Sequence, residues 1–158
     1  MQLTASQDVD APLQAVFDAL SDFDALEARC AANGIDVTAD GPAQPGPHGP
    51  VPRRWKAAFT LRGKPREASV TLAAYEPPKR LAFDGVSGGL ETRTELTLSA
   101  LSATETRVEM RTELMPQTLS ARLLVQSLKL GRAKTETRLT DRMGRAAREI
   151  EKRYRDAG

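Results

Sequence analysis

The sequence predicts an α+β fold in which a curved antiparallel sheet of about seven strands is covered on one face by a long C-terminal helix. Two observations support this prediction. Residues 53–116 alternate between apolar and polar side chains and are divided by turn residues, as in half-buried antiparallel strands. Residues 119–155 contain no proline, and their apolar side chains recur at the spacing of an amphipathic helix. One terminal helix can cover such a sheet only if the sheet is strongly curved.

The length and the cysteine content limit the class of protein. The 158 residues correspond to a single domain, 1–158, which is long enough to bury a core of its own. Cys30 is the only cysteine, so the chain has no intrachain disulfide and does not fit a secreted disulfide scaffold. The first ten residues lack the apolar segment of a signal peptide, and no apolar run approaches the roughly 20 residues that span a bilayer. We therefore expect a cytoplasmic protein.

The first 40 residues predict one strand followed by two short helices. Residues 3–9 alternate loosely, as in a half-buried strand. Asp10 can cap a first helix, and Asp22 can cap a second helix over 23–32, because a carboxylate accepts the free N–H groups at a helix start. Gly34 marks the turn after the second helix.

The segment 41–52 interrupts the predicted sheet. It contains five prolines and three glycines, which cannot form the interior of a sheet because proline has no backbone N–H to donate. We expect a long loop without secondary structure. Loops of this kind are usually functional or disordered, so the segment is either a lid over a cavity mouth or a disordered insertion.

The C-terminal segment 119–155 is too long for one helix on a domain of this size, since at 1.5 Å per residue it would extend roughly 50 Å. We expect a break near Gly131, which gives a short apolar helix followed by a long basic one. From Gln117 onward the chain has 11 Lys/Arg and 5 Asp/Glu, whereas the residues before it have 12 and 16. The positive charge is therefore concentrated on the terminal helices.

This basic segment is suited to contact a partner, although a solvated helix face is the simpler interpretation. Between Leu123 and Leu130 there are more apolar side chains than one stripe can bury. The surplus indicates contact with a ligand, a second copy in a homodimer, an anionic membrane surface or an acidic protein. Nucleic acid is not expected, because the segment has only one aromatic residue for stacking. The residues expected at a membrane or partner contact are Leu124, Leu128, Arg132, Arg138 and Arg142.

Two sequence motifs resemble the START-related/polyketide cyclase superfamily (SRPBCC), whose fold is called helix-grip or Bet v 1-like. The first motif occupies residues 9–22 and contains Val-Asp-Ala-Pro, Val-Phe and Leu-Ser-Asp. The second, Tyr-Glu-Pro-Pro-Lys-Arg-Leu at 75–81, is similar to the family's Pro-Pro-x-Arg-Leu hairpin between middle strands. The resemblance covers almost the whole chain. The tryptophan that the family usually has near the start of the second helix is missing at residues 23–26, and the loop at 41–52 looks inserted.

The resemblance implies a deep apolar cavity between the curved sheet and the terminal helix. The alternation of the strands gives its lining, which is mostly large and apolar and includes three threonines whose hydroxyls need partners. There are three alternatives to this cavity lining. The apolar residues could simply pack in the core, the threonines could bond to each other, or a register slip of one residue could turn these side chains to the other face. The expected lining residues are Trp55, Phe59, Leu72, Phe83, Thr92, Thr94, Leu96, Met110, Thr112 and Leu123.

The sequence contains no arrangement typical of catalysis or metal binding. His48 is the only histidine and lies in the proline-rich loop, and Cys30 is most simply a small buried side chain, so a usual metal site cannot be formed. Glu91 and Glu95 alternate with arginines on the outer face, and Asp84 also points outward. No phosphate- or dinucleotide-binding fingerprint is present. We expect no catalytic residue, no metal and no cofactor.

These observations favour the binding, transport or sensing of a hydrophobic small molecule, such as a lipid, a quinone or a polyketide-like compound. The molecule would occupy the cavity between the sheet and the terminal helix. One alternative is a cyclase- or dehydratase-like enzyme, which would need an ionisable group facing the cavity. Another is a protein-interaction module that uses the basic helix, and a peripheral position at a membrane is the alternative to a purely cytoplasmic location.

Overall fold

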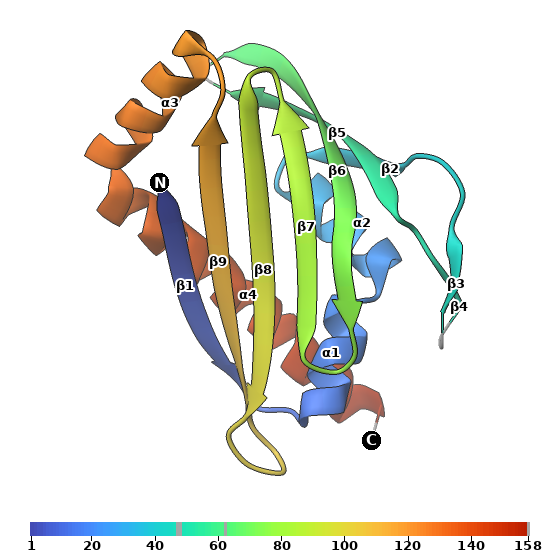
Figure 1. Ribbon diagram of the computed structural model, residues 1–158. Helices are drawn as coiled ribbons and strands as arrows, with labels where there is room; N and C mark the ends of the chain where they lie inside the picture. The colour runs from blue at the N-terminus through green and yellow to red at the C-terminus, as the bar shows by residue number, and fades with distance from the viewer. Residues whose placement is uncertain (47–48, 62, 158) are drawn as a thin grey trace.

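A computed structural model of the protein describes residues 1–46, 49–61 and 63–157, and it confirms the α+β architecture. Seven strands form one antiparallel sheet in the spatial order β1-β9-β8-β7-β6-β5-β2 (Figure 1). The first strand therefore pairs with the last one, β5 to β9 follow one another as hairpins, and β2 lies at the edge beside β5. The strands of this sheet are β1 (Gln2–Val9), β2 (Asp36–Ala39), β5 (Arg54–Leu61), β6 (Lys64–Glu76), β7 (Arg80–Ser87), β8 (Leu90–Ala100) and β9 (Thr106–Pro116).

Two pairs of helices accompany the sheet: α1 (Leu13–Leu20) with α2 (Phe23–Ala32), and α3 (Leu119–Leu130) with α4 (Arg132–Ala157). Figure 1 shows α4 crossing behind the sheet from the β1 edge toward α1, whereas α3 lies at the upper end, next to β9. The predicted break at Gly131 is confirmed. Its N–H donates to the carbonyl of Leu128 at 3.1 Å, which closes the last turn of α3.

The two predicted helix caps have different outcomes. Asp22 caps α2, because its carboxylate accepts the N–H of Ala25 at 3.3 Å. The prediction for Asp10 is wrong, because the N-cap position of α1 is occupied by Pro12, two residues later, and no side chain caps the helix. The N–H of Asp10 instead donates to the Glu151 carboxylate of α4 at 2.8 Å. This bond attaches the end of β1 to the terminal helix.

The expectation of a loop without secondary structure at 41–52 is wrong for part of the segment. β3 (Gln44–Gly46) and β4 (Gly49–Val51) form a separate two-stranded sheet, in which two prolines pair opposite each other. An isolated ribbon tolerates these prolines because it has no further strand that needs their missing N–H groups. The segment stays out of the main sheet, as its composition requires. His48 lies outside the described residues.

The face of the sheet that α4 does not cover carries pairs of opposite charges. Arg93 donates to Asp84 at 2.7 Å, and Arg107 donates to Asp8 at 2.8 Å, each across neighbouring strands. The hydrogen bond from Arg93 holds the pKa of Asp84 below its ordinary value. Asp84 therefore points outward, as predicted, and its carboxylate accepts hydrogen bonds from Arg93 on the solvated face of the sheet.

The opposite, inner face carries two separate hydrophobic cores. The larger core lies beneath α1 and the C-terminal half of α4 and includes Phe17 and Leu72, both almost completely buried. The smaller core lies beneath α3 and is formed by Leu3, Leu114 and Val125. The candidate site lies on the inner face between these two cores.

Candidate functional site

A row of inward-facing side chains crosses the sheet from Phe83, which packs against the larger core, to Leu3 of the smaller core. The strand registers place Phe83 beside Thr94, Thr94 beside Thr112, and Thr112 beside Leu3. Phe83, Thr94 and Thr112 are only partly buried, although they lie on the face that α4 crosses. In the larger core, by contrast, the neighbouring side chain of Leu72 is 0% exposed. The inner face therefore remains partly accessible between the cores.

Thr94 and Thr112 form a hydroxyl pair in the middle of this row, with their Oγ1 atoms 3.0 Å apart. This is the mutual bonding that the sequence left open as an alternative. One hydroxyl donates to the other, and the second hydroxyl keeps its hydrogen for another acceptor. The pair is therefore satisfied by itself and can still donate one hydrogen bond to a polar group placed over it.

Thr92 lies in the next row, between Gly85 of β7 and Leu114 of β9. A Cβ atom at Gly85 would come within 2.6 Å of the Thr92 Oγ1 atom. The missing side chain at Gly85 thus provides the space that the Thr92 hydroxyl occupies. Sequence reasoning found Thr92 but not Gly85, because the role of the glycine depends on the register between two strands.

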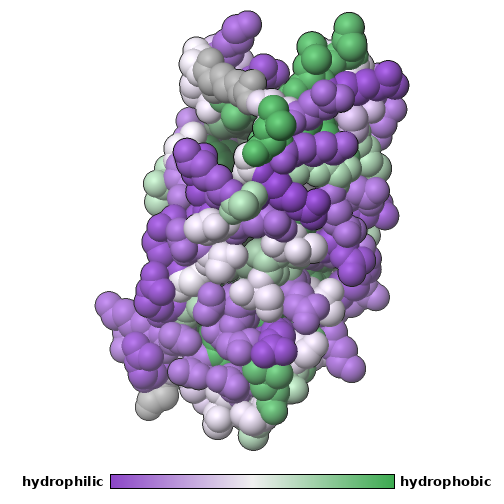
Figure 2. All heavy atoms as spheres, turned by 90° about the vertical axis from the view of Figure 1, so that its left-hand side faces the viewer, coloured by the Kyte–Doolittle hydropathy of each residue, from purple (hydrophilic) through white to green (hydrophobic). Residues whose placement is uncertain are grey.

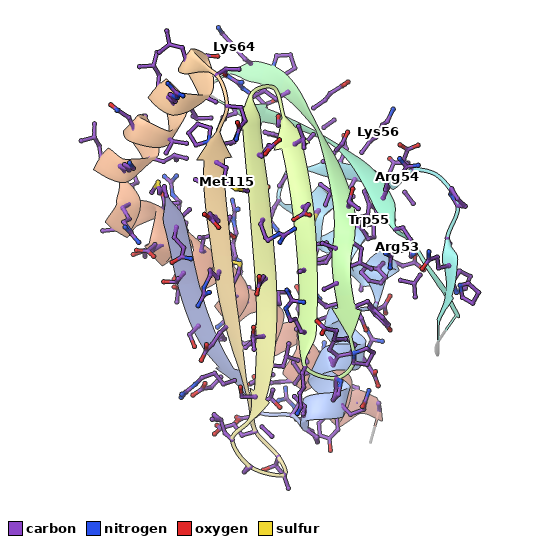
Figure 3. All side chains as sticks on the ribbon, in the orientation of Figure 1. Arg53, Arg54, Trp55, Lys56, Lys64 and Met115 are labelled. Carbon is purple, nitrogen blue, oxygen red and sulfur yellow. The ribbon has the colours of Figure 1, made fainter. Side chains whose placement is uncertain are left out.

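Aromatic side chains connect the row to α2. The ring of Trp55 lies 6.0 Å from that of Phe83 and 5.4 Å from that of Phe23 on α2. Its indole N–H donates to the carboxylate of Glu27 at 3.1 Å, which provides the partner that a buried indole needs. Figure 3 shows Trp55 on β5 between its two charged neighbours, whose side chains are exposed. Sequence reasoning missed Glu27, because no local pattern places it against β5.

The predicted lining residues fall into three groups. Trp55 and Leu72 belong to the larger core, where their exposed fractions are 3% and 0%. Leu123 is 62% exposed, so its predicted place in the cavity is wrong. The side of α3 that faces the sheet is formed by Ala121 and Val125 instead. The other seven are partly buried on the strands: Phe59, Phe83, Thr92, Thr94, Leu96, Met110 and Thr112.

The residues predicted at a membrane or partner contact do not form one surface. Leu124 and Leu128 are partly buried, and Leu128 packs on the smaller core. Arg132 donates to the carbonyl of the first β1 residue at 2.7 Å. Arg138 and Arg142 are exposed on α4. The structure therefore separates the leucines from the arginines that the sequence grouped with them.

A groove of about 640 Å³ lies between α2 and α4. Small side chains leave the space between the two helices unfilled there. The ion pair between Arg29 Nε and Glu149 Oε2, 3.2 Å long, bridges the helices. The other charged side chains at the groove, Arg142 and Arg145, are both positive. The groove is lined by Ala25, Ala28, Arg29, Ala32, Asn33, Arg142, Arg145, Ala146 and Glu149.

A second opening, of about 510 Å³, lies where the end of α1 meets the start of α2, beside β4. Arg153 of α4 donates to the carboxylate of Asp22 there at 2.9 Å. Burial raises the pKa of Asp22, but the hydrogen bonds from the Ala25 N–H and from Arg153 outweigh it. The pKa of Asp22 therefore lies below its ordinary value. This corner is thus held together by an ionised carboxylate.

Within the described ranges, no group of three or more His, Cys, Asp or Glu side chains is arranged to hold a metal ion. Burial raises the pKa of the Cys30 thiol, which keeps it protonated at neutral pH. No helix in this part of the chain is both long enough and apolar enough to cross a bilayer.

Comparison with known proteins identifies what the chain is similar to. Residues 1–151 match the profile of a family described as "Polyketide cyclase / dehydrase and lipid transport". A comparison with curated proteins finds no match.

Several solved structures share the fold. The Zhui aromatase/cyclase from Streptomyces sp. R1128 superimposes with a TM-score of 0.71 at 13% identity, over 100% of this chain and 98% of that one. A conserved protein from Geobacillus kaustophilus gives a TM-score of 0.69 at 16% identity, over 96% of each chain. A START superfamily protein from Mycobacterium smegmatis gives 0.61 at 12% identity, over 99% of each chain. At these identities the similarity establishes the fold.

Proposed function

This chain belongs to the polyketide cyclase / dehydrase and lipid transport family, and from that premise we propose that it binds a hydrophobic small molecule on the inner face of its sheet. The observation that carries the proposal is the partly accessible row between the two cores. Phe83, Thr94 and Thr112 would be closed off if this region were ordinary core, as Leu72 is.

The physical chemistry of the row supports a ligand of mixed character. Burying apolar surface contributes roughly 25 cal/mol per Å², so an apolar molecule covering Phe83, Leu96 and Met110 would be bound by the hydrophobic effect. The Thr94–Thr112 pair retains one hydroxyl hydrogen for an acceptor. The arrangement therefore suits a largely apolar molecule that carries one oxygen function, such as a lipid, a quinone or a polyketide-like compound.

The groove between α2 and α4 is the entrance that we propose for this ligand. The alanines of its lining, such as Ala25 and Ala146, give the groove an apolar wall. Three arginines against one glutamate give its rim a positive charge, which favours a ligand with an acidic or strongly polar end. The Arg29–Glu149 ion pair bridges the groove and must separate when a ligand enters.

Binding without turnover is the role that these groups support. The sheet residues at the site contribute hydroxyls, which orient a polar group but do not exchange protons near neutral pH. The similar structures include a START superfamily protein as well as an aromatase/cyclase. We therefore propose a carrier or sensor, and a cyclase is the competing function.

Energy transfer from Trp55 to cis-parinaric acid tests the proposal, because the only tryptophan lies 6.0 Å from Phe83 of the row. We expect saturable transfer in the wild type and its loss in Thr94→Phe, which fills the row. Thr97→Phe is the matched control, since Thr97 lies on the same strand but is exposed on the other face. Equal transfer in both variants, with unchanged thermal unfolding, would exclude the proposed site.

A further inference from the structure

Helix α3 has a second apolar stripe that faces away from the protein. Of the six large hydrophobic side chains that are exposed in the described residues, three belong to this helix: Leu119, Leu123 and Leu130, with exposed fractions of 73%, 62% and 93%. At about 100° per residue they fall within about 40° of one another. Ala121 and Val125, which face the smaller core, lie on the opposite side.

The surroundings of this outer stripe, Leu119, Leu123 and Leu130, are positively charged. Residues 117–135 contain Arg122, Lys129, Arg132 and Lys134 and no aspartate or glutamate. Arg122 and Lys129 lie along one side of the stripe on the helix surface. Neither of them forms an ion pair or a side-chain hydrogen bond with another described residue. Their charges are therefore available to a partner outside the chain.

The position of α3 makes the outer stripe accessible. Figure 1 shows the helix at the upper end of the molecule, beyond β9. Figure 2 shows the side of the molecule on which α3 lies, and hydrophobic atoms gather at its upper end beside hydrophilic ones. The helix is about 18 Å long, which is too short to cross a bilayer but sufficient to lie along its surface.

We propose that the outer stripe of α3 docks on an anionic phospholipid surface. The three leucines enter the boundary between headgroups and acyl chains, and Arg122 and Lys129 beside them contact the lipid phosphates. Charge complementarity selects this occupant, because a second copy of the chain would bring a set of like charges against the stripe. The proposal goes beyond ligand binding and does not depend on it.

Docking at this helix would also act on the candidate site. The inner side of α3 packs through Val125 on Leu3 and Leu114. Leu3 is the register partner of Thr112, and Leu114 is that of Thr92. A helix that is held by the membrane therefore lies next to the end of the threonine rows.

Vesicle flotation tests the proposal with the full-length protein and phosphatidylcholine vesicles that either contain or lack phosphatidylglycerol. We expect binding to the anionic vesicles, weaker binding in high salt, and little binding to phosphatidylcholine alone. Replacing the three leucines together, as Leu119→Gln, Leu123→Gln and Leu130→Gln, should lower partitioning at least about tenfold. Leu101→Gln, at an exposed apolar residue elsewhere, is the matched control and should leave it unchanged.

Three results would overturn the proposal. The first is that the wild type does not float with anionic vesicles. The second is that the triple variant floats as well as the wild type, which would mean that charge alone attracts the protein. The third is that the wild type is a dimer which the triple variant dissociates, which would assign the outer stripe to a second copy. Because the three leucines are exposed, the triple variant should unfold at the same temperature as the wild type. The double variant Arg122→Gln with Lys129→Gln tests the contribution of charge to vesicle binding in the same assay.

Discussion

The hydroxyl pair of Thr94 and Thr112 provides the sharpest prediction about the inner face. Each threonine is to be replaced by the isosteric valine, alone and together. The Oγ1 atoms are 3.0 Å apart and partly buried, so the bond between them stabilises the fold by roughly 0.5–1.5 kcal/mol. A single replacement also leaves the other hydroxyl without its partner. We expect each single variant to lose about 1 kcal/mol of unfolding free energy.

The double variant should behave differently from the sum of the two. Replacing both hydroxyls with methyl groups leaves no polar atom unsatisfied and adds apolar surface to the strands, so its stability should be close to that of the wild type. The coupling between the two positions should therefore amount to about 2 kcal/mol. Denaturant unfolding followed by the fluorescence of Trp55, the only tryptophan and a buried one, measures all four proteins.

Ligand affinity should fall in the double variant even though its stability is kept. The double variant loses the hydroxyl hydrogen that we assign to the ligand, so its affinity for a ligand bearing an oxygen acceptor should fall about three- to tenfold. Additive destabilisation in the double variant would refute the bonded pair. Unchanged affinity together with normal coupling would refute its contact with the ligand.

Three other predictions concern stability. Thr106→Val should cost about 1–3 kcal/mol in denaturant unfolding, because the fully buried Thr106 hydroxyl donates to the Ala11 carbonyl at 2.8 Å and the carbonyl would lose its partner; a cost near zero would argue against that bond. Gly144→Ala should raise the melting temperature, since a Cβ there meets its neighbours at ordinary contact distance and alanine favours the helix by up to about 1 kcal/mol. A lower melting temperature would show that the packing around α4 has no room for the added methyl group. The pKa of Asp22 is lowered in the folded state. The ionised Asp22 carboxylate therefore stabilises the fold above its ordinary pKa, and this stabilisation is lost as the pH falls through the pKa of the folded state. The stability of Asp22→Asn in acid unfolding should show a smaller pH dependence in that range.

The strands and their inward registers could be predicted from the sequence because each strand carries its own period of two. Thr94 and Thr112 lie in neighbouring strands with the same phase, and the register that joins them follows from the short turn between β8 and β9. The break at Gly131 was also predictable, since an uninterrupted helix would have been longer than the domain. Such signals predicted the main sheet and the terminal helices, but not the β3–β4 ribbon.

The wrong prediction for Leu123 shows what the pattern within one segment cannot determine. Helix α3 has apolar residues on two opposite sides, and periodicity alone does not tell which side faces the sheet. The small side chains of Ala121 and Val125 allow α3 to approach Leu3 and Leu114. Leu119, Leu123 and Leu130 are turned outward. Similarly, the contact of Glu27 with Trp55 depends on how α2 packs on β5, which no pattern in either segment contains.

The most direct test of the central claim is native mass spectrometry of gently purified protein, followed by denaturing extraction. If the inner face binds a hydrophobic molecule, a discrete additional mass should be present, should be lost on denaturation, and should be absent from Thr94→Phe while remaining in Thr97→Phe. A protein that carries no additional mass, and that acquires none after incubation with long-chain fatty acids or a quinone, would contradict the claim.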